Sequence, residues 1–131
     1  MQAEINMALG STTAMPRIIL ADEQPVGYAH AVDGALWGDA MPADLPSGAW
    51  DIDIFIASEA HRGRGLGAAA LKLLRDEVFA TTLAVAISVL VSVRNERAVR
   101  AYEKAGFRWL RVIDDPEIGP AWIMLADRPQ R

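Results

Sequence analysis

The first half of the chain alternates short apolar runs with turn residues, a pattern typical of β-strands. Residues 17–21 and 26–32 are predicted strands, and the turn-forming residues 22–25 between them predict a hairpin. Residues 34–49 are rich in Gly, Pro and Asp and are expected to form a long loop. Residues 50–57 form the next predicted strand, whose apolar run indicates a central position that is buried on both faces.

The second half of the chain changes to a helical period. Residues 66–79 carry an apolar stripe at helical spacing, and residues 85–93 alternate Val and Ile with smaller residues, which predicts a strand. Asn95 then stands where a helix N-cap belongs, and the helix that follows it ends at about Lys104, before Gly106.

Two more strands are predicted at residues 107–113 and 121–126, joined as a hairpin by the turn 114–120. The element order is therefore ββ-β-α-β-α-β-β. It predicts an α/β (α+β) fold in which helices pack on the faces of a mixed sheet. Residues 16–131 are expected to form a single domain, and residues 1–15, which show no periodicity, are expected to be an arm or disordered.

Composition places the chain among globular proteins and excludes several kinds of site. The 131 residues are 52% hydrophobic, which fits one domain with a buried core. Because the chain has no cysteine, it has no disulfide, no thiolate metal site and no cysteine nucleophile. His30 and His61 do not form a metal-ligand spacing, so no metal is expected. Without a signal-peptide pattern or a bilayer-spanning apolar run, a cytoplasmic protein without membrane contact is expected.

Charge is distributed unevenly along the chain, whose net charge is −4. Between Ile18 and His61 there are eight Asp and Glu residues and no Lys or Arg, whereas from Arg62 onward 12 basic residues outnumber eight acidic ones. The acidic segment fits a cationic partner, although solvated acidic loops explain it equally well. The basic half is too mildly charged to predict a nucleic-acid partner.

A glycine-rich loop follows the strand predicted at residues 50–57. Residues 62–67 read Arg-Gly-Arg-Gly-Leu-Gly, and the helix predicted at 66–79 begins inside them. Glycine lets the backbone approach a ligand closely, and a helix N-terminus presents free N–H groups and the positive end of its dipole. The loop is therefore predicted to bind a phosphorylated cofactor, with Arg62 and Arg64 adding positive charge.

Two motifs of the chain resemble the GNAT superfamily of N-acyltransferases. Residues 62–67 match its acyl-CoA pattern, Arg/Gln-x-x-Gly-x-Gly/Ala, and Asn95, Ala98 and residues 102–107 (Tyr-Glu-Lys-Ala-Gly-Phe) match a second motif. Either motif alone is modest evidence, but the two in this order are specific. The likeness covers about residues 15–128, and within the superfamily the chain resembles the aminoglycoside 6′-N-acetyltransferases more closely. It implies a GNAT-like, mostly antiparallel sheet with a splayed central pair of parallel strands, and acetyl-CoA as cofactor.

The resemblance also implies roles in the cofactor site. Amides of the glycine loop hold the diphosphate, and the strand edge at Phe55, Ile56 and Ala57 pairs with the pantetheine arm and polarises the thioester carbonyl. Asn95 donates to the same arm, caps its helix, or does both. Tyr102 is the general acid that protonates the leaving thiolate. The expected cofactor residues are Phe55, Ile56, Ala57, Arg62, Gly63, Arg64, Gly65, Leu66, Gly67, Asn95, Ala98 and Tyr102.

An ammonium acceptor must lose a proton before it attacks, and Asp53 is the predicted base. Asp53 interrupts an apolar strand, where a carboxylate is costly unless it is paired or functional, and it matches the catalytic aspartate of the aminoglycoside enzymes. It takes the proton or holds the ammonium in place, and Glu59 is the alternative base. Trp37, Asp115 and Glu117 are predicted to line the acceptor site, although Trp37 also fits packing and the two acids also fit a turn.

The start of the chain departs from the family. Members carry a first strand and two helices before the hairpin predicted here from residue 17, and residues 1–15 do not resemble that block. A minimal enzyme, a site completed by a second subunit and a loss of activity all fit this departure. Sheet edges left uncovered favour a homodimer.

The functional hypothesis from the sequence is an enzyme that transfers acetyl from acetyl-CoA to a primary amine of a cationic small molecule, with an aminoglycoside as first candidate. One alternative is an acyltransferase for another amine, such as a siderophore precursor or a peptide N-terminus. The other is a non-catalytic acyl-CoA-binding module.

Overall fold

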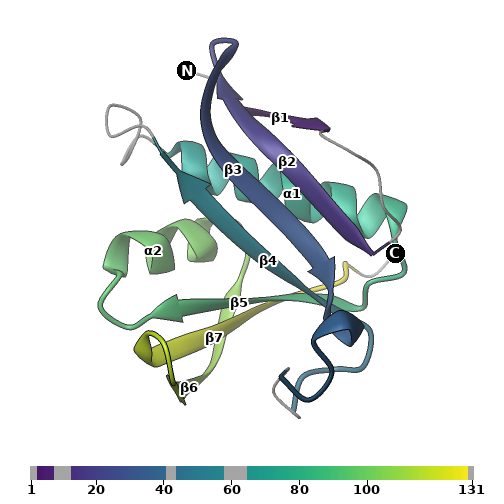
Figure 1. The fold of residues 1–131 in the computed structure, drawn as a ribbon, viewed down its shortest axis with the longest axis vertical. Coiled ribbons are helices and arrows are strands. Elements are labelled where there is room, and N and C mark those ends of the chain that lie inside the picture. The colour runs from purple at the N-terminus through teal and green to yellow at the C-terminus, as the bar shows by residue number, and fades with distance from the viewer. Residues whose placement is uncertain (1–2, 8–12, 41–43, 58–64, 130–131) are drawn as a thin grey trace.

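Seven strands form one mixed sheet in the order β1-β2-β3-β4-β5-β7-β6 (Figure 1). The computed structural model describes residues 3–7, 13–40, 44–57 and 65–129. Every neighbouring pair of strands is antiparallel except β4 and β5, which are parallel. The elements in chain order are β1 (Ala3–Met7), β2 (Ala14–Ala21), β3 (Gln24–Asp33), the 3-10 helix η1 (Gly34–Ala40), β4 (Ala49–Ile56), α1 (Leu66–Thr81), β5 (Ala86–Ser92), α2 (Glu96–Lys104), β6 (Arg108–Asp115) and β7 (Gly119–Asp127).

From β2 onward the observed strands and α-helices follow the predicted order. Two differences concern segments without a strong local pattern. Part of the loop predicted at 34–49 forms η1, and part of the arm predicted at 1–15 forms β1, which pairs with β2 from Ala3↔Ala21 to Met7↔Arg17. The five residues of β1 are too few for a clear period of two, and the strand depends on the main-chain edge that β2 offers it.

β1 lies within residues 1–15, which were expected to form an arm or to be disordered, and corrects that expectation. Only residues 8–13 lie between β1 and β2. Six residues are too few for the two helices that the resemblance leads one to expect there, because an average α-helix alone has about 11 residues. The departure from the family is therefore a short β1–β2 connection.

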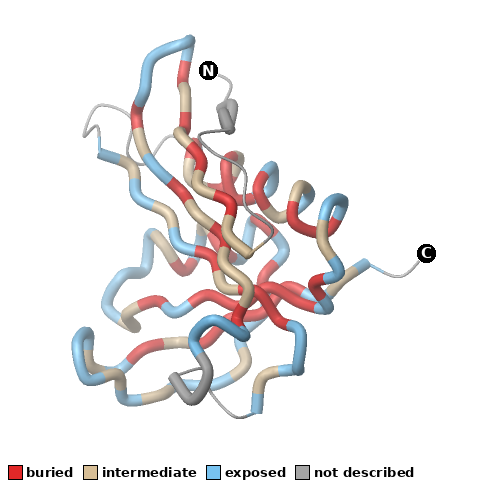
Figure 2. The backbone as a smooth tube through the Cα atoms, turned by 45° about the vertical axis from the view of Figure 1, so that its right-hand side comes forward, coloured by how far each residue is buried: buried red, intermediate tan, exposed pale blue. Residues whose placement is uncertain are grey.

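The main hydrophobic core lies between the sheet and the two α-helices. Ile19, Ile52 and Val89 point from three strands toward α1, whose Leu71 and Leu74 are fully buried. Figure 1 shows α1 running behind β2, β3 and β4. In Figure 2 the buried segments gather where these layers meet, and the exposed ones include the tip of the β2–β3 hairpin. Burial of this one face is the main source of stability for the sheet.

An ion pair also ties the sheet to α1. Arg17 of β2 is 4% exposed, and its guanidinium donates to both carboxylate oxygens of Glu77 at 2.9 and 2.6 Å. Glu77 lies on α1, 60 residues further along the chain. Such a bidentate pair fixes the two elements relative to each other, although its net effect on stability is small compared with the cost of removing one partner.

The opposite face of β2, β3 and β4 is called the open face here, because within the described residues both α-helices lie on the other side. Cross-strand pairing places Tyr28 between Ile18 and Phe55, and His30 opposite Asp53. Side chains that are directly opposite in neighbouring strands point to the same face. The open face therefore combines aromatic side chains with a carboxylate.

The parallel pair in the middle of the sheet separates after three residue pairs, Ala49↔Ala86, Trp50↔Ile87 and Asp51↔Ser88. Beyond them β4 continues to Ile56 and β5 to Ser92 without pairing to each other. Figure 1 shows the two strands diverging from this point, with α1 and α2 beginning beyond their far ends. The splayed parallel pair that the resemblance implied is confirmed.

Candidate active site

The start of α1 has the geometry of an anion site. Gly65 precedes the helix with φ 78°, a left-handed conformation that favours glycine, and no side chain of the described residues caps the helix. A Cβ atom built at Gly65 or Gly67 would meet nothing within 4 Å, so packing within the described residues does not require glycine at either position for lack of space. Uncapped N–H groups beside such room fit a phosphate. Arg62, Gly63, Arg64, and also Glu59 and His61, lie outside the described residues.

The edge of β4 that faces the splay does not present all the amides that the prediction named. The amide of Ala57 donates to the carbonyl of Val26 in β3 at 2.8 Å, so it is not the thioester-polarising donor expected there. Amides alternate in direction along a strand, so the Phe55 amide also faces β3 and the Ile54 amide faces the splay. The Ile54 amide donates to the Asp53 carboxylate at 2.9 Å. Sequence alone does not reveal which set of amides faces the partner strand.

Tyr102 lies on α2 inside the main core. Its side chain is 4% exposed and packs edge-to-face against Phe107, with ring centroids 5.6 Å apart. Among the described residues, none forms a hydrogen bond with its hydroxyl. Burial, and then the negative charges of Asp53 and Asp51, raise the pKa of Tyr102 above its ordinary value. The phenol is therefore held in its protonated form, which a proton donor requires.

Asn95 caps the start of α2. Its side-chain oxygen accepts a hydrogen bond from the amide of Ala98 at 3.2 Å. The cap that the sequence predicted is confirmed, and it uses only the oxygen. The amide –NH₂ of Asn95 is a separate donor, so capping is compatible with the predicted contact to a cofactor.

Two carboxylates lie on the same face of β4 at the splay. Asp53 is exposed and stands opposite His30. Asp51 is two residues earlier, at the last position where β4 pairs with β5, and its carboxylate accepts a long hydrogen bond of 3.5 Å from the Ser88 hydroxyl. Burial, and then the charge of Asp53, raise the pKa of Asp51 to about 7.

The sequence reasoning missed Asp51. The available signal was its spacing, because Asp51 and Asp53 alternate with Ile52 and Ile54 and therefore share one face of a strand. The pattern did not indicate how far each of the two carboxylates is buried. Asp51 sits where the two strands still pair, whereas Asp53 lies beyond the separation and is exposed.

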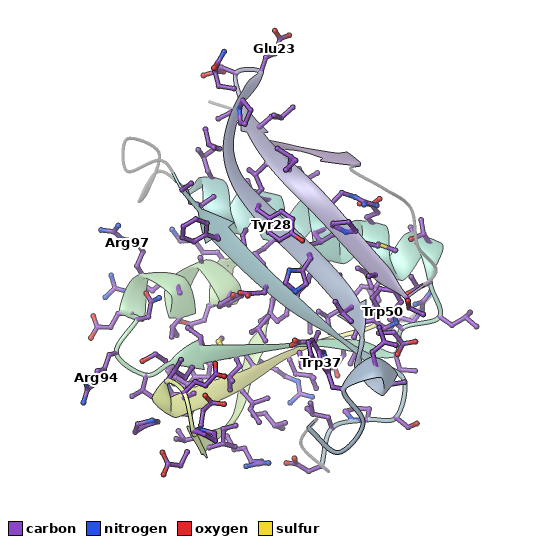
Figure 3. The ribbon with its side chains drawn as sticks, in the orientation of Figure 1. Glu23, Tyr28, Trp37, Trp50, Arg94 and Arg97 are labelled. Carbon is purple, nitrogen blue, oxygen red and sulfur yellow. The ribbon has the colours of Figure 1, made fainter. Side chains whose placement is uncertain are left out.

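Two of the other predicted acceptor residues, Asp115 and Glu117, lie in a hairpin that does not neighbour β4. Asp115 and Glu117 belong to the β6–β7 hairpin, and β6 is separated from β4 by β5 and β7. One oxygen of Asp115 accepts hydrogen bonds from the amides of Glu117 and Ile118 at 2.9 and 3.0 Å, so Asp115 stabilises the turn. Trp37 lies in η1 and is 45% exposed (Figure 3). A role for Trp37 or Glu117 at the acceptor stays a prediction.

The arrangement places different groups on the two sides of the splay. The core face holds Tyr102 and the start of α1, and the open face holds Asp51 and Asp53. A thioester lying between the parted strands would meet a proton donor from one side and carboxylates from the other. This is a suitable geometry for acyl transfer from a phosphorylated thioester to an amine.

Comparison with known proteins identifies the family of the chain. The acetyltransferase (GNAT) domain family matches residues 1–115. The chain belongs to the GNAT acetyltransferase family. The matched residues of this GNAT protein include the glycine-rich sequence 62–67, the strands β4 and β5, and α2.

Individual relatives are similar over most of this chain. It is 31% identical over 121 residues to an aminoglycoside N(6′)-acetyltransferase type 1 of Klebsiella pneumoniae, covering 92% of this chain and 60% of that protein. It is 35% identical over 77 residues to a kanamycin resistance protein of Rhizobium radiobacter, covering 59% of this chain and 70% of that protein. The chain thus spans about 60% of the length of the first of these relatives.

Solved structures agree with this relationship. The aminoglycoside acetyltransferase AAC(6′)-Ib in complex with coenzyme A and kanamycin superposes with a TM-score of 0.79 at 30% identity, over 89% of this chain and 68% of that one. The same enzyme in complex with acetyl-CoA and paromomycin also gives a TM-score of 0.79, over 66% of that chain. Among the described residues of the GNAT protein, no helix has the length and apolar character needed to cross a membrane.

Proposed function

We propose that this GNAT protein transfers an acetyl group from acetyl-CoA to a primary amine of a cationic small molecule. The observation that carries the proposal is the separation of β4 from β5 directly after Asp51, with Tyr102 on one side of it and the two carboxylates on the other. The related structures named above hold coenzyme A or acetyl-CoA and an aminoglycoside. An aminoglycoside is therefore the first acceptor to test.

The cofactor half of the proposal rests on backbone groups. The amides at the start of α1 bind the diphosphate, and the edges of β4 and β5 that part from each other after Asp51↔Ser88 receive the amide-bearing pantetheine arm as they would a short strand. The Ile54 amide, which faces the splay, is positioned to polarise the thioester carbonyl once Asp53 exchanges this amide for an ammonium. Arg97 projects from the first turn of α2 (Figure 3) and is a candidate for a phosphate of the cofactor.

The acceptor half rests on charge. Residues 18–61 contain no Lys or Arg, and Arg17 is occupied by Glu77 on the core face. Within the described residues neither Asp51 nor Asp53 forms an ion pair. Carboxylates without a cationic partner favour binding of an ammonium group, and the exposed rings of Tyr28 and Phe55 beside them add a surface for a cation.

The reaction needs no covalent enzyme intermediate. The neutral amine attacks the thioester carbonyl, the C–N bond forms, and the C–S bond breaks as the thiolate leaves. Tyr102 supplies a proton to that thiolate. A phenol with a raised pKa is a weak acid. The proton of Tyr102 is therefore transferred to the leaving sulfur only as negative charge develops on that sulfur.

A second function, binding of acyl-CoA without catalysis, is favoured by the short β1–β2 connection. The six residues of this connection cannot hold the two helices that the resemblance leads one to expect before the hairpin. The test uses calorimetry with acetyl-CoA, followed by mass spectrometry of a reaction with an amine panel that contains kanamycin, spermidine and a peptide. A gain of one acetyl group on an amine supports the enzyme. Binding of acetyl-CoA without any acetylated amine supports the binding module, and no binding of acetyl-CoA contradicts both.

A further inference from the structure

The two carboxylates of β4 occupy different surroundings although they share one face. Asp51 is at the closed end of the splay, with Val32 of β3 opposite it and Ser88 of β5 beside it. Asp53 is about 7 Å further along the strand, beyond the separation, and is exposed to solvent. Asp51 is thus half-buried between two strands, whereas Asp53 is exposed.

We propose that Asp51 takes the proton from the acceptor ammonium, and that Asp53 holds the ammonium at the open face without taking its proton. This inference rests on the proposed function and assigns roles within it. Asp53 lies beyond the point where β4 and β5 separate and is exposed to solvent, so an arriving ammonium can reach its carboxylate directly. Asp51 is half-buried between β3 and β5, so its charged form is disfavoured and a proton is bound there more strongly than on a free aspartate.

The groups around Asp51 agree with this assignment. Asp53 faces it from the same strand, His30 of β3 stands opposite Asp53, and Tyr102 of α2 interacts electrostatically with both carboxylates. Asp44, in the segment before β4, is held in an ion pair by Arg111. With burial and the charge of Asp53 both raising it, the pKa of Asp51 at about 7 suits a base working near neutral pH.

The protons balance as follows. The ammonium loses its first proton to Asp51, which passes it to water by way of the exposed side of the pair. The free amine then forms the C–N bond. The nitrogen loses its second proton to water as the C–S bond breaks, and the thiolate receives a proton from Tyr102, which water replaces. The net products are the N-acetyl amine, free coenzyme A and one proton.

The experiment measures kcat/KM against pH for the wild type and four variants, with acetyl-CoA and the amine identified above. The wild type is expected to lose activity below about pH 7. Asp51→Asn is expected to lose this acid limb and to be about 100-fold slower at pH 8. Asp53→Asn is expected to raise KM and to move the limb to lower pH, because the repelling charge is gone. Ser88→Ala is expected to move it to higher pH, because a donor to the carboxylate is gone.

The control is Asp22→Asn at the tip of the β2–β3 hairpin, where the left-handed backbone, φ 51°, also accepts asparagine. It is expected to behave as the wild type. The assignment is overturned when Asp53→Asn removes the acid limb while Asp51→Asn only shifts it. It is also overturned when Asp51→Asn retains the wild-type profile.

A second readout does not depend on activity. Carbon NMR of the side-chain carboxyl groups, with Asp51→Asn and Asp53→Asn used for assignment, follows each titration in the cofactor-free protein. Asp51 is expected to titrate near pH 7 and to move lower in Asp53→Asn. An Asp51 that titrates near its ordinary value of about 4 overturns the inference even in an active enzyme. A protein that acetylates no amine overturns the proposed function, and with it the role of Asp51 as an acceptor base.

Discussion

Replacing Tyr102 by phenylalanine separates catalysis from stability, because it removes only the hydroxyl. The ring is 4% exposed and packs on Phe107, and the variant keeps that contact. Since no described residue hydrogen-bonds the hydroxyl, its removal leaves no partner unsatisfied. We therefore expect the free energy of unfolding to change by less than about 1 kcal/mol. Loss of the proton donor is expected to lower kcat about 100-fold, which corresponds to about 2.7 kcal/mol in activation free energy.

The assay follows release of the free thiol of coenzyme A with a chromogenic disulfide, and urea denaturation gives the stability. The matched control is Phe107→Leu, which removes the other ring of the pair. It is expected to lower the free energy of unfolding by about 1–2 kcal/mol while leaving the chemical step largely intact. Because the pKa of Tyr102 is raised, the wild type is also expected to show no loss of activity from this group below pH 10. A Tyr102→Phe enzyme within threefold of the wild-type kcat refutes the role as acid. A loss of stability as large as that of Phe107→Leu refutes the separation of the two effects.

Four other outcomes are expected. Gly27→Ala lowers the free energy of unfolding by about 2 kcal/mol in urea, because its Cβ would lie 2.3 Å from the backbone oxygen of Phe55; an unchanged midpoint contradicts the close approach of β3 and β4. Arg17→Met lowers the free energy of unfolding by about 3 kcal/mol, because it leaves Glu77 unpaired beside the core. The double variant Arg17→Met/Glu77→Leu recovers at least half of this loss, and additive effects of the two substitutions contradict the pairing. The raised pKa of Asp51 means that the native state binds a proton at this carboxyl more tightly than the unfolded chain does, so the stability gained from the proton is complete below about pH 4 and is lost as pH rises through about 7. Asp51→Asn is therefore expected to melt higher than the wild type at pH 8.5 and equally at pH 4. The same difference in melting temperature at both pH values contradicts this expectation. Light scattering at micromolar concentration is expected to give a dimer mass, because β1 and β6 are the outer strands of the sheet, and a monomer mass rejects that expectation.

Local chemistry allowed much of the cofactor half to be read from the sequence. The helix predicted at residues 66–79 is observed as Leu66–Thr81, and its start at Gly65 follows from a backbone conformation that glycine favours. The Asn95 cap and the end of α2 before Gly106 are likewise decided by neighbouring residues. These features involve groups a few positions apart, so a pattern in the chain is sufficient to predict them.

The features that the sequence did not reveal depend on contacts between distant segments. The strand β1 exists through pairing with β2, and the direction of the Ala57 amide follows from its bond to Val26 in a neighbouring strand. The raised pKa of Asp51 arises from burial where β4 and β5 part, and the charges that act on Tyr102 come from residues about 50 positions earlier. The sequence by itself determined the two α-helices, the Asn95 cap and the order of the elements from β2 onward. Only the tertiary structure decided how deeply each carboxylate is enclosed, because solvation depends on what other strands and helices place around it.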